Sequence, residues 1–307
     1  MMSTALVFPG QGSQYVGMGF AFSEHNERAN SIFAMARETC GRELLDAMFL
    51  GPEETLKKTD FTQPAILTVS VAIYEAIKDS VKPVFFAGHS LGEYSALCCA
   101  GAMDFKTAVE MVKLRGSLMQ EASGKAASGM AAVLGLDVEN IKLLCEKVKP
   151  AGDMSLANIN CPGQIVVSGD SAAIDAGEAA AKELGAKRYI KLAVAGAFHS
   201  RFMQSAADGM AENMASFNMK DTAVPVISNV TAQAVTKAEE IKKLLVRQIV
   251  SPVRWIESVE YMKAQGVDTF IECGPGAVLS GLIKKIDKNL KIINIEKPDD
   301  LLKLQEI

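Results

Sequence analysis

The sequence is poor in histidine and tryptophan and has no long hydrophobic run. Three histidines and one tryptophan occur among 307 residues, and the six cysteines show no C-x-x-C spacing. This composition argues against a zinc site, so we expect no metal. No apolar run approaches the roughly 20 residues that span a membrane. Residues 1–9 carry no basic leader before their short apolar run, so we expect neither a membrane protein nor a secreted one.

An excess of positive charge is also missing. The chain has 32 Lys and Arg against 36 Asp and Glu, a net charge of −4. No field over the whole chain would attract nucleic acid, and an acidic partner would need a local basic patch. We expect the cysteines to be reduced thiols in the core of a cytoplasmic protein. With 49% hydrophobic residues, the chain can form one large α/β domain with a smaller companion.

The most informative stretch is 84–100. An apolar run typical of a buried strand leads into Gly88-His89-Ser90-Leu91-Gly92, and a helical segment follows. This is the strand, turn and helix context of a G-x-S-x-G nucleophile elbow, in which small residues permit a sharp turn and expose the serine hydroxyl. Ser90 is therefore the candidate nucleophile. The alternative is an incidental serine in a glycine-rich turn.

A serine nucleophile needs a base, and the chain offers three histidines. His25 lies among charged residues, and His89 is locked beside the serine. His199 stands at or next to the start of a helix expected to run to about residue 217, where the helix dipole disfavours imidazolium. If Ser90 has a histidine base, His199 is that base. No acid in a matching context would orient it. A backbone carbonyl near a helix end is one alternative, and the others are Asp208, Asp221 and Asp268.

A first strand at 4–8 is followed by Gly10-Gln11-Gly12. The third glycine of a dinucleotide-binding G-x-G-x-x-G is replaced by Tyr15, so a phosphate site is poorly supported. A glycine-flanked loop can instead direct a backbone N–H at a neighbouring site, and Gln11 is the candidate for a second oxyanion donor. An ordinary tight loop is the alternative.

Arg115 lies on the inward stripe of a helix capped by Asp104, four residues before Met119. A buried guanidinium needs an anion, either a carboxylate of the protein or a carboxylate of the substrate. An earlier apolar helix is expected to start with Thr62 as its N-cap. Gln63, the residue after this cap, would face the site or serve only as part of the cap.

Strands and helices alternate between 125 and 196 in the order βαββαβ, which is typical of a ferredoxin-like unit. We therefore expect an inserted small domain at 125–196 and a larger α/β-hydrolase-like domain formed by 1–124 and 197–307. Strands at 223–228, 268–273 and 291–295 with intervening helices would complete a mainly parallel sheet. Asn158 and Asn160 are candidates to point into a cleft between the domains, and for Asn160 the alternative is a role in the turn alone.

Several motifs in this order resemble the malonyl-CoA:acyl carrier protein transacylases of fatty-acid synthesis across essentially the whole chain. The motifs are Phe8-Pro9-Gly10-Gln11-Gly12-Ser13-Gln14, Gly88-His89-Ser90-Leu91-Gly92-Glu93, Arg115, Asn158-x-Asn160-x-Pro162-Gly163-Gln164, Gly196-Ala197-Phe198-His199-Ser200 and Glu272-x-Gly274-Pro275.

The resemblance implies a Ser90 nucleophile and a His199 base oriented by the backbone carbonyl of Gln248. It also implies an oxyanion hole from the N–H groups of Gln11 and Leu91, and pairing of Arg115 with the malonyl carboxylate. Phe198 and Leu91 match the malonyl-selecting versions of their motifs. The remaining substrate-binding candidates are Met119, Asn158, Asn160 and Gln63.

The function expected from this resemblance is transfer of malonyl from malonyl-CoA to acyl carrier protein by a monomer without a cofactor. A serine esterase or thioesterase with the same elbow is the alternative enzyme, and a carrier-protein docking module with a vestigial site is the non-enzymatic alternative. Carrier proteins are acidic, so a docking surface should be basic. The docking candidates share a positive charge and are Lys187, Arg188, Lys191, Lys284, Lys285 and Lys288.

Overall fold

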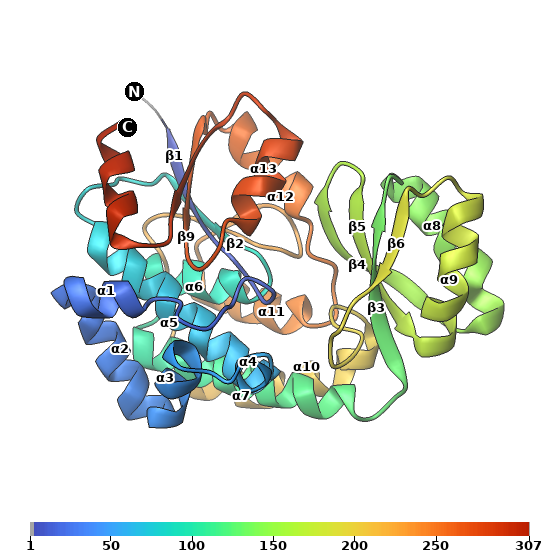
Figure 1. The fold of residues 1–307 in the computed structure, drawn as a ribbon, viewed down its shortest axis with the longest axis horizontal. Coiled ribbons are helices and arrows are strands. Elements are labelled where there is room, and N and C mark those ends of the chain that lie inside the picture. Colours follow the sequence, from blue (N-terminus) through green and yellow to red (C-terminus); the bar gives the residue numbers. More distant parts are fainter. Residues whose placement is uncertain (1–2, 307) are drawn as a thin grey trace.

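The computed structural model describes residues 3–306 and contains two separate sheets with their helices (Figure 1). The larger sheet has the strand order β10-β9-β1-β2-β7-β8, and its first five strands are parallel. Its strands are β1 (Thr4–Phe8), β2 (Phe85–Gly88), β7 (Val226–Ile227), β8 (Ala234–Val235), β9 (Thr269–Cys273) and β10 (Lys291–Ile295). The predicted mainly parallel sheet is confirmed.

Helices cover both faces of this sheet, because its strands alternate side chains between two apolar clusters. Leu6 and Phe8 belong to one cluster, whereas Ala5 and Val7 belong to the other. The helices of this part are α1 (Phe20–His25), α2 (Glu27–Cys40), α3 (Arg42–Phe49), α4 (Glu53–Leu56), α5 (Thr59–Ile77), α6 (Leu91–Cys99), α7 (Phe105–Ser123), α10 (Gln204–Asn213), α11 (Ala238–Gln248), α12 (Trp255–Ala264) and α13 (Val278–Ile286). No helix of residues 3–306 is long and apolar enough to cross a membrane.

Helix α5 is buried nearly all round, as its composition predicts, but the predicted start of this helix is wrong. The helix begins at Thr59, and Pro64 lies inside it. The Thr62 hydroxyl donates to the Leu56 carbonyl instead of accepting from a helix N–H. The short helix α4 brings the chain into α5 one turn upstream of the proline, so the first turn forms before the residue taken for the cap.

The smaller sheet is antiparallel with the order β4-β5-β3-β6. Its strands and helices follow the chain order β3 (Ser128–Leu134), α8 (Val138–Val148), β4 (Met154–Cys161), β5 (Gln164–Asp170), α9 (Ser171–Glu183) and β6 (Arg188–Lys191). This confirms the predicted ferredoxin-like βαββαβ order. Helices α8 and α9 pack on one face of the sheet through its own apolar cluster, while Met130 and Val166 extend the core of the large part. The boundaries 125–196, 1–124 and 197–307 stay predictions.

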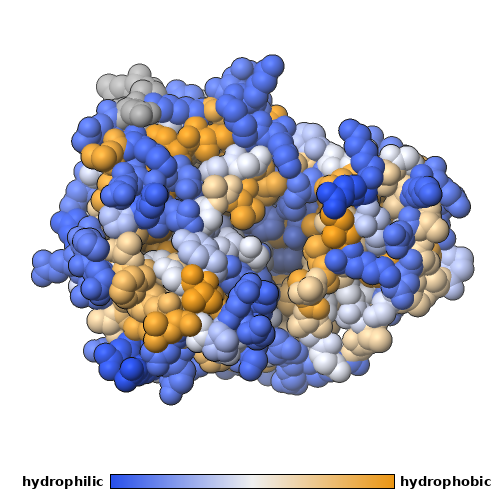
Figure 2. Space-filling model, in the orientation of Figure 1, coloured by the Kyte–Doolittle hydropathy of each residue, from blue (hydrophilic) through white to orange (hydrophobic). Residues whose placement is uncertain are grey.

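Backbone hydrogen bonds join the two parts beside the expected cleft. The N–H of Ile159 donates to the Val253 carbonyl at 2.9 Å, and the N–H of Val253 donates to the Ala157 carbonyl at 2.8 Å. Strand β4 is thereby held against the segment between α11 and α12. The same two segments form an isolated parallel bridge between Asn158 and Val253, and Figure 2 shows a hollow between the two parts.

The strand predicted at 223–228 is shorter than expected, and its hairpin with β8 was not predicted. Only Val226 and Ile227 form strand β7. Pro225 has no N–H to donate to a neighbouring strand, and Ser228 already turns the chain by donating to the Gln233 carbonyl. Short 3-10 turns complete the described chain: η1 (Lys149–Ala151), η2 (Arg201–Met203), η3 (Met214–Ser216) and η4 (Pro298–Glu306).

Candidate active site

Ser90 occupies a strained turn between β2 and α6. Its φ of 54° and ψ of −106° are rarely adopted by a residue with a Cβ. A Cβ on Gly88 would lie 1.9 Å from the backbone of Gly92, and one on Gly92 would lie 2.0 Å from the Phe8 carbonyl oxygen. Both glycines are therefore required for the strand and the helix to approach so closely. The geometry is that of the predicted elbow.

A chain of hydrogen bonds leads from the Ser90 hydroxyl into the protein. Ser90 Oγ lies 2.8 Å from His199 Nε2, and His199 Nδ1 lies 2.9 Å from the Gln248 carbonyl oxygen. Because that carbonyl can only accept, Nδ1 carries the proton and the neutral Nε2 faces the hydroxyl. The three candidate aspartates all bond elsewhere, namely Asp208 with Gln204, Asp221 with Lys237 and Ala238, and Asp268 with Ser3 and Thr269.

Burial, together with Arg115, keeps His199 neutral. The residue is 4% exposed. Desolvation lowers its pKa to about 3, with a further contribution from the Arg115 charge. His199 lies just before Ser200, the N-cap of the 3-10 turn η2 that continues into α10, and the expected contribution of a helix dipole stays a prediction. A ring that stays neutral at physiological pH can accept the Ser90 proton.

Arg115 is 1% exposed and is held by neutral groups. Its Nη1 donates to Gln63 Oε1 at 2.7 Å, and its Nη2 donates to Gln248 Oε1 at 3.0 Å and to Ser90 Oγ at 3.2 Å. The guanidinium carbon lies 5.2 Å from the centroid of the Tyr94 ring.

Arg115 forms no direct ion pair in the part of the chain described, although the buried Glu93 interacts with its charge at longer range. No carboxylate oxygen of residues 3–306 lies within 4 Å of its nitrogens. The more ordinary of the two sequence-based interpretations, a carboxylate of the protein as partner, is therefore wrong for these residues. A buried cation held only by neutral groups favours binding of an anion.

A cavity of about 110 Å³ opens onto Ser90 and Arg115. Its walls come from the elbow, the loop after β1, helix α7 and the small sheet, and they consist of Gln11, His89, Ser90, Leu91, Arg115, Met119, Met130, Asn158, Leu192, Val194, Phe198 and His199. Within residues 3–306, the backbone N–H groups of Gln11 and Leu91 donate to no other group of the protein. Two unpaired N–H groups beside the nucleophile are what stabilisation of an oxyanion needs, and their role as oxyanion donors stays a prediction.

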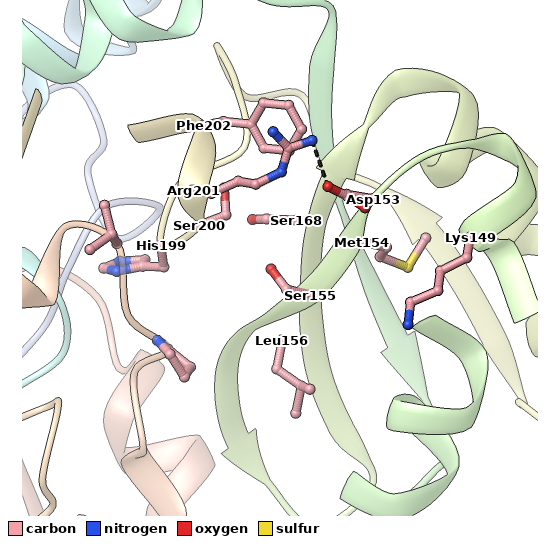
Figure 3. Close-up of a pocket in the computed structure, with 12 residues that line it drawn as sticks. Lys149, Asp153, Met154, Ser155, Leu156, Ser168, His199, Ser200, Arg201 and Phe202 are labelled. Atoms are coloured by element: carbon pink, nitrogen blue, oxygen red, sulfur yellow. Dashed lines mark ion pairs between the residues drawn. The ribbon is translucent and has the colours of Figure 1, made fainter. Parts of the chain in front are cut away.

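A second cavity of about 480 Å³ lies on the other side of His199 and is lined by β4, η1 and η2 (Figure 3). Figure 3 shows Ser155 and Leu156 on β4 across from His199. Its charged groups are already paired, because Arg201 contacts Asp153 at 2.7 Å and Lys149 contacts Glu146 at 2.6 Å. This cavity reaches the base but, among the described residues, not Ser90 or Arg115.

Residues 5–296 match the family model described as the acyl transferase domain. The chain belongs to the acyl transferase family. It is 47% identical over 303 residues to the malonyl CoA-acyl carrier protein transacylase of Bacillus subtilis, covering 98% of this chain and 96% of the relative. Identity to the enzyme of the same name from Staphylococcus aureus is 45%, covering 98% of each chain.

Solved structures agree with this assignment. The acyl-carrier-protein-S-malonyltransferase of Bartonella henselae superimposes with a TM-score of 0.96 at 37% identity, covering 99% of both chains. A malonyl-transacylase in complex with a type II polyketide acyl-carrier protein superimposes with a TM-score of 0.95 at 41% identity, covering 99% of both chains. The resemblance to malonyl-CoA:acyl carrier protein transacylases is thus confirmed, and the chain is an acyltransferase enzyme.

The remaining predicted site residues of the acyltransferase divide between the cavity wall and its support. Met119, Phe198 and Asn158 line the cavity, and the Asn158 Oδ1 has no hydrogen-bond partner among the described residues. Gln63 holds Arg115, and its Nε2 lies 3.7 Å from Met119 Sδ. Asn160 does not line the cavity but contacts His89 Nε2 through Oδ1 at 2.8 Å. Their roles toward substrate stay predictions.

The predicted docking residues are exposed, but three of them have partners within the chain. Lys191 pairs with Asp175 at 2.5 Å, Lys285 Nζ donates to Gln164 Oε1 at 3.2 Å, and Lys284 Nζ donates to the Lys288 carbonyl at 2.5 Å. Arg188 is the first residue of β6, and Lys187 immediately precedes it. Their part in docking stays a prediction.

Two groups that support the site were missed from the sequence. Glu93 and Asn229 are buried beside Ser90 and hydrogen-bond to each other. A signal existed for Glu93, since it is the one charged residue of an otherwise apolar helix. Asn229 gave no signal, because nothing local marks a residue after a short strand. Three apolar wall residues were also missed: Met130, Leu192 and Val194.

Proposed function

We propose that this acyltransferase moves a malonyl group from malonyl-CoA to the phosphopantetheine thiol of an acyl carrier protein through a malonyl-Ser90 ester. The observation that carries the proposal is Arg115, a buried guanidinium that lies 3.2 Å from Ser90 Oγ and has only neutral partners. A malonyl group esterified to Ser90 would bring its free carboxylate to this cation. The names of the relatives from Bacillus subtilis and Staphylococcus aureus support the same substrates.

In the first half-reaction, His199 Nε2 accepts the Ser90 proton while Oγ attacks the thioester carbonyl carbon of malonyl-CoA. The carbonyl π electrons move to oxygen, and the N–H groups of Gln11 and Leu91 stabilise the negative charge. Collapse of this intermediate breaks the C–S bond. The coenzyme A sulfur leaves as a thiol with the proton from His199, and the malonyl ester remains on Ser90.

The second half-reaction reverses the roles. His199 accepts the proton of the carrier thiol, the sulfur attacks the ester carbonyl, and the same two N–H groups hold the oxyanion. Breaking the C–O bond returns Oγ to Ser90 with the proton from His199. Because every group named here belongs to this chain or to the substrates, the proposal requires no cofactor, and a monomer suffices.

Hydrolysis of the ester is the competing outcome. The cavity is small and several of its walls are apolar, including Met119, Met130 and Phe198, which limits the room for water beside an esterified Ser90. The basic candidates for carrier docking are exposed on or next to β6 and α13. We expect Lys285→Glu to raise KM for the carrier protein without slowing malonylation of Ser90.

The experiment that tests the function is intact-mass measurement after brief exposure to malonyl-CoA. We expect wild type to gain one malonyl group and Ser90→Ala to gain none. Addition of a phosphopantetheine-bearing carrier protein should then discharge the ester to the carrier. Discharge to water at the same rate with or without the carrier would identify a serine esterase, and absence of any adduct on wild type would overturn the enzymatic mechanism.

A further inference from the structure

Glu93 is a buried carboxylate that the proposed mechanism does not use. It is the third residue of α6 and is 2% exposed. Its Oε2 accepts hydrogen bonds from Gln248 Nε2 at 2.7 Å and from the Asn229 backbone N–H at 3.1 Å. These two partners come from α11 and from the loop after β7, so one oxygen of Glu93 joins three elements at the elbow.

Both partners of Glu93 also hold the backbone of Ser90, one on each side. The Ser90 N–H donates to Asn229 Oδ1 at 2.7 Å, and the Ser90 carbonyl accepts from Gln248 Nε2 at 2.9 Å. Asn229 Nδ2 further donates to the Gly88 carbonyl at 2.6 Å. Two amide side chains thus hold the strained residue, and Glu93 accepts from the side chain of Gln248 and from the backbone N–H of Asn229.

Glu93 also determines which way the Gln248 side chain faces. The two Nε2 hydrogens go to the Ser90 carbonyl and the Glu93 carboxylate, so Oε1 is left to accept from Arg115 Nη2 at 3.0 Å. A carboxylate is an acceptor only, and it cannot hydrogen-bond to the opposite orientation of the amide. The orientation of Gln248 therefore connects the nucleophile to the guanidinium.

We propose that Glu93 is a positioning residue, which acts through Gln248 and Asn229 to hold Ser90 in its reactive geometry and to aim Arg115. The proposal rests on Ser90 being the nucleophile of the proposed function. Burial is unfavourable for the carboxylate and raises its pKa to about 7 against several opposing hydrogen bonds. An apolar side chain would avoid that penalty. Only a hydrogen-bond acceptor, however, can bind both the Gln248 side-chain amide and the Asn229 backbone N–H.

The first test measures acylation of Ser90 by p-nitrophenyl acetate, a neutral activated ester whose reaction does not depend on malonyl recognition. We expect Glu93→Ala to slow this acylation on the order of 100-fold, because small misplacements of a reacting group cost about that factor. The KM for the ester should change by less than about twofold, whereas loss of ester binding would raise it. Glu93→Gln retains an acceptor oxygen and should recover acylation to within about tenfold of wild type.

A matched control is Glu272→Gln. Glu272 is also a buried acid, but it accepts from Leu279 and Ser280 at the start of α13 and does not contact the Ser90 network. We expect this variant to lower the melting temperature without changing the acylation rate. An equal loss of rate in Glu272→Gln and Glu93→Ala would assign both effects to stability and overturn the proposal.

The decisive measurement is a double-mutant cycle between Glu93→Ala and Gln248→Ala, which keeps the Gln248 backbone carbonyl. If Glu93 acts through Gln248, the double variant should be no more than about threefold slower than the slower single variant. Losses that multiply would overturn the proposal. If Glu93→Ala does not fold, Glu93→Asp replaces it, because a carboxylate withdrawn by one methylene cannot reach both partners. An acylation rate equal to that of wild type in Glu93→Asp would refute the positioning role.

The ester assay separates this proposal from the proposed function. If wild type forms no malonyl ester but reacts with p-nitrophenyl acetate, the malonyl function fails while the ester rates still test Glu93. If wild type is malonylated and Glu93→Ala reacts with both substrates at the wild-type rate, the positioning role fails alone. A malonyl-CoA rate that falls more than the ester rate would support the added role in aiming Arg115.

Discussion

Replacing Arg115 by alanine should abolish the preference for malonyl over acetyl. Arg115 offers a planar edge beside Ser90, where Nη2 already donates to Oγ at 3.2 Å and Nη1 has one protein partner, Gln63. A hydrogen bond to a charged group contributes about 1.5–3 kcal/mol. Two such bonds to a malonyl carboxylate would contribute about 3–6 kcal/mol, so their loss should lower kcat/KM for malonyl-CoA by at least about 100-fold.

The assay compares acylation of Ser90 by malonyl-CoA and acetyl-CoA in wild type and Arg115→Ala. Acetyl has no carboxylate, so its kcat/KM should change by less than about tenfold, and the malonyl:acetyl ratio should fall by about 100-fold. Arg115→Lys should give an intermediate ratio, because an ammonium cannot form the same two parallel bonds.

Arg201→Ala is the matched control for this prediction. Arg201 lines the second cavity and is paired with Asp153, so its loss should leave the malonyl:acetyl ratio unchanged. An unchanged ratio in Arg115→Ala would refute the reasoning, and a lowered ratio in Arg201→Ala would place the carboxylate in the second cavity. Thermal unfolding of each variant checks that the altered rates belong to folded protein.

Three further predictions test the geometry. Because the folded chain lowers the pKa of His199 to about 3 while an unfolded histidine protonates below about 6.5, His199 should stay a neutral base through pH 6.5, and its own contribution to the free energy of unfolding should fall as the pH drops below that value. Burial raises the pKa of Glu93 to about 7, so the rate is measured in Glu93→Gln, and an inflection near pH 6.5 in that variant would contradict this. Gly92→Ala should lower the free energy of unfolding by about 3 kcal/mol or more, because its Cβ would meet a carbonyl oxygen at 2.0 Å. In Gly281→Ala the Cβ would meet nothing within 4 Å, so chemical denaturation should show that free energy unchanged or raised by about 1 kcal/mol. Gln63→Leu should reduce the malonyl:acetyl ratio by about tenfold, because Arg115 Nη1 loses its 2.7 Å acceptor, and an unaltered ratio would show that Gln63 does not orient the guanidinium.

Local sequence was sufficient where local geometry decides the outcome. The elbow was predictable because two glycines around Ser90 permit only a few backbone paths between a strand and a helix. The helical period likewise placed Arg115 on the inward face of α7, where it is 1% exposed. With only three histidines in the chain, elimination identified the one whose ring lies 2.8 Å from Ser90 Oγ.

Groups that meet from distant parts of the chain could not be predicted from local pattern. Glu93, Gln248 and Asn229 form one network, yet Gln248 is 155 residues from Glu93 in sequence. The Gln248 carbonyl was expected near His199 from the resemblance alone, and its side chain carried no expectation. The start of α5 at Thr59 was also missed. The path of the chain through the preceding helix α4 decides where the first turn forms, and the residues at the turn itself do not show that path.

The neutral partners of Arg115 connect substrate choice to the strength of the base. A carboxylate in place of Gln63 or Gln248 would neutralise the guanidinium and compete with the malonyl carboxylate for it. The two amides orient the cation and leave its charge available. The same charge is one of the causes that lower the pKa of His199, so a malonyl carboxylate bound to Arg115 would offset that contribution and strengthen the base. An acetyl group brings no charge and would leave His199 a weaker base, so under the proposed function selection would act on proton transfer as well as on binding.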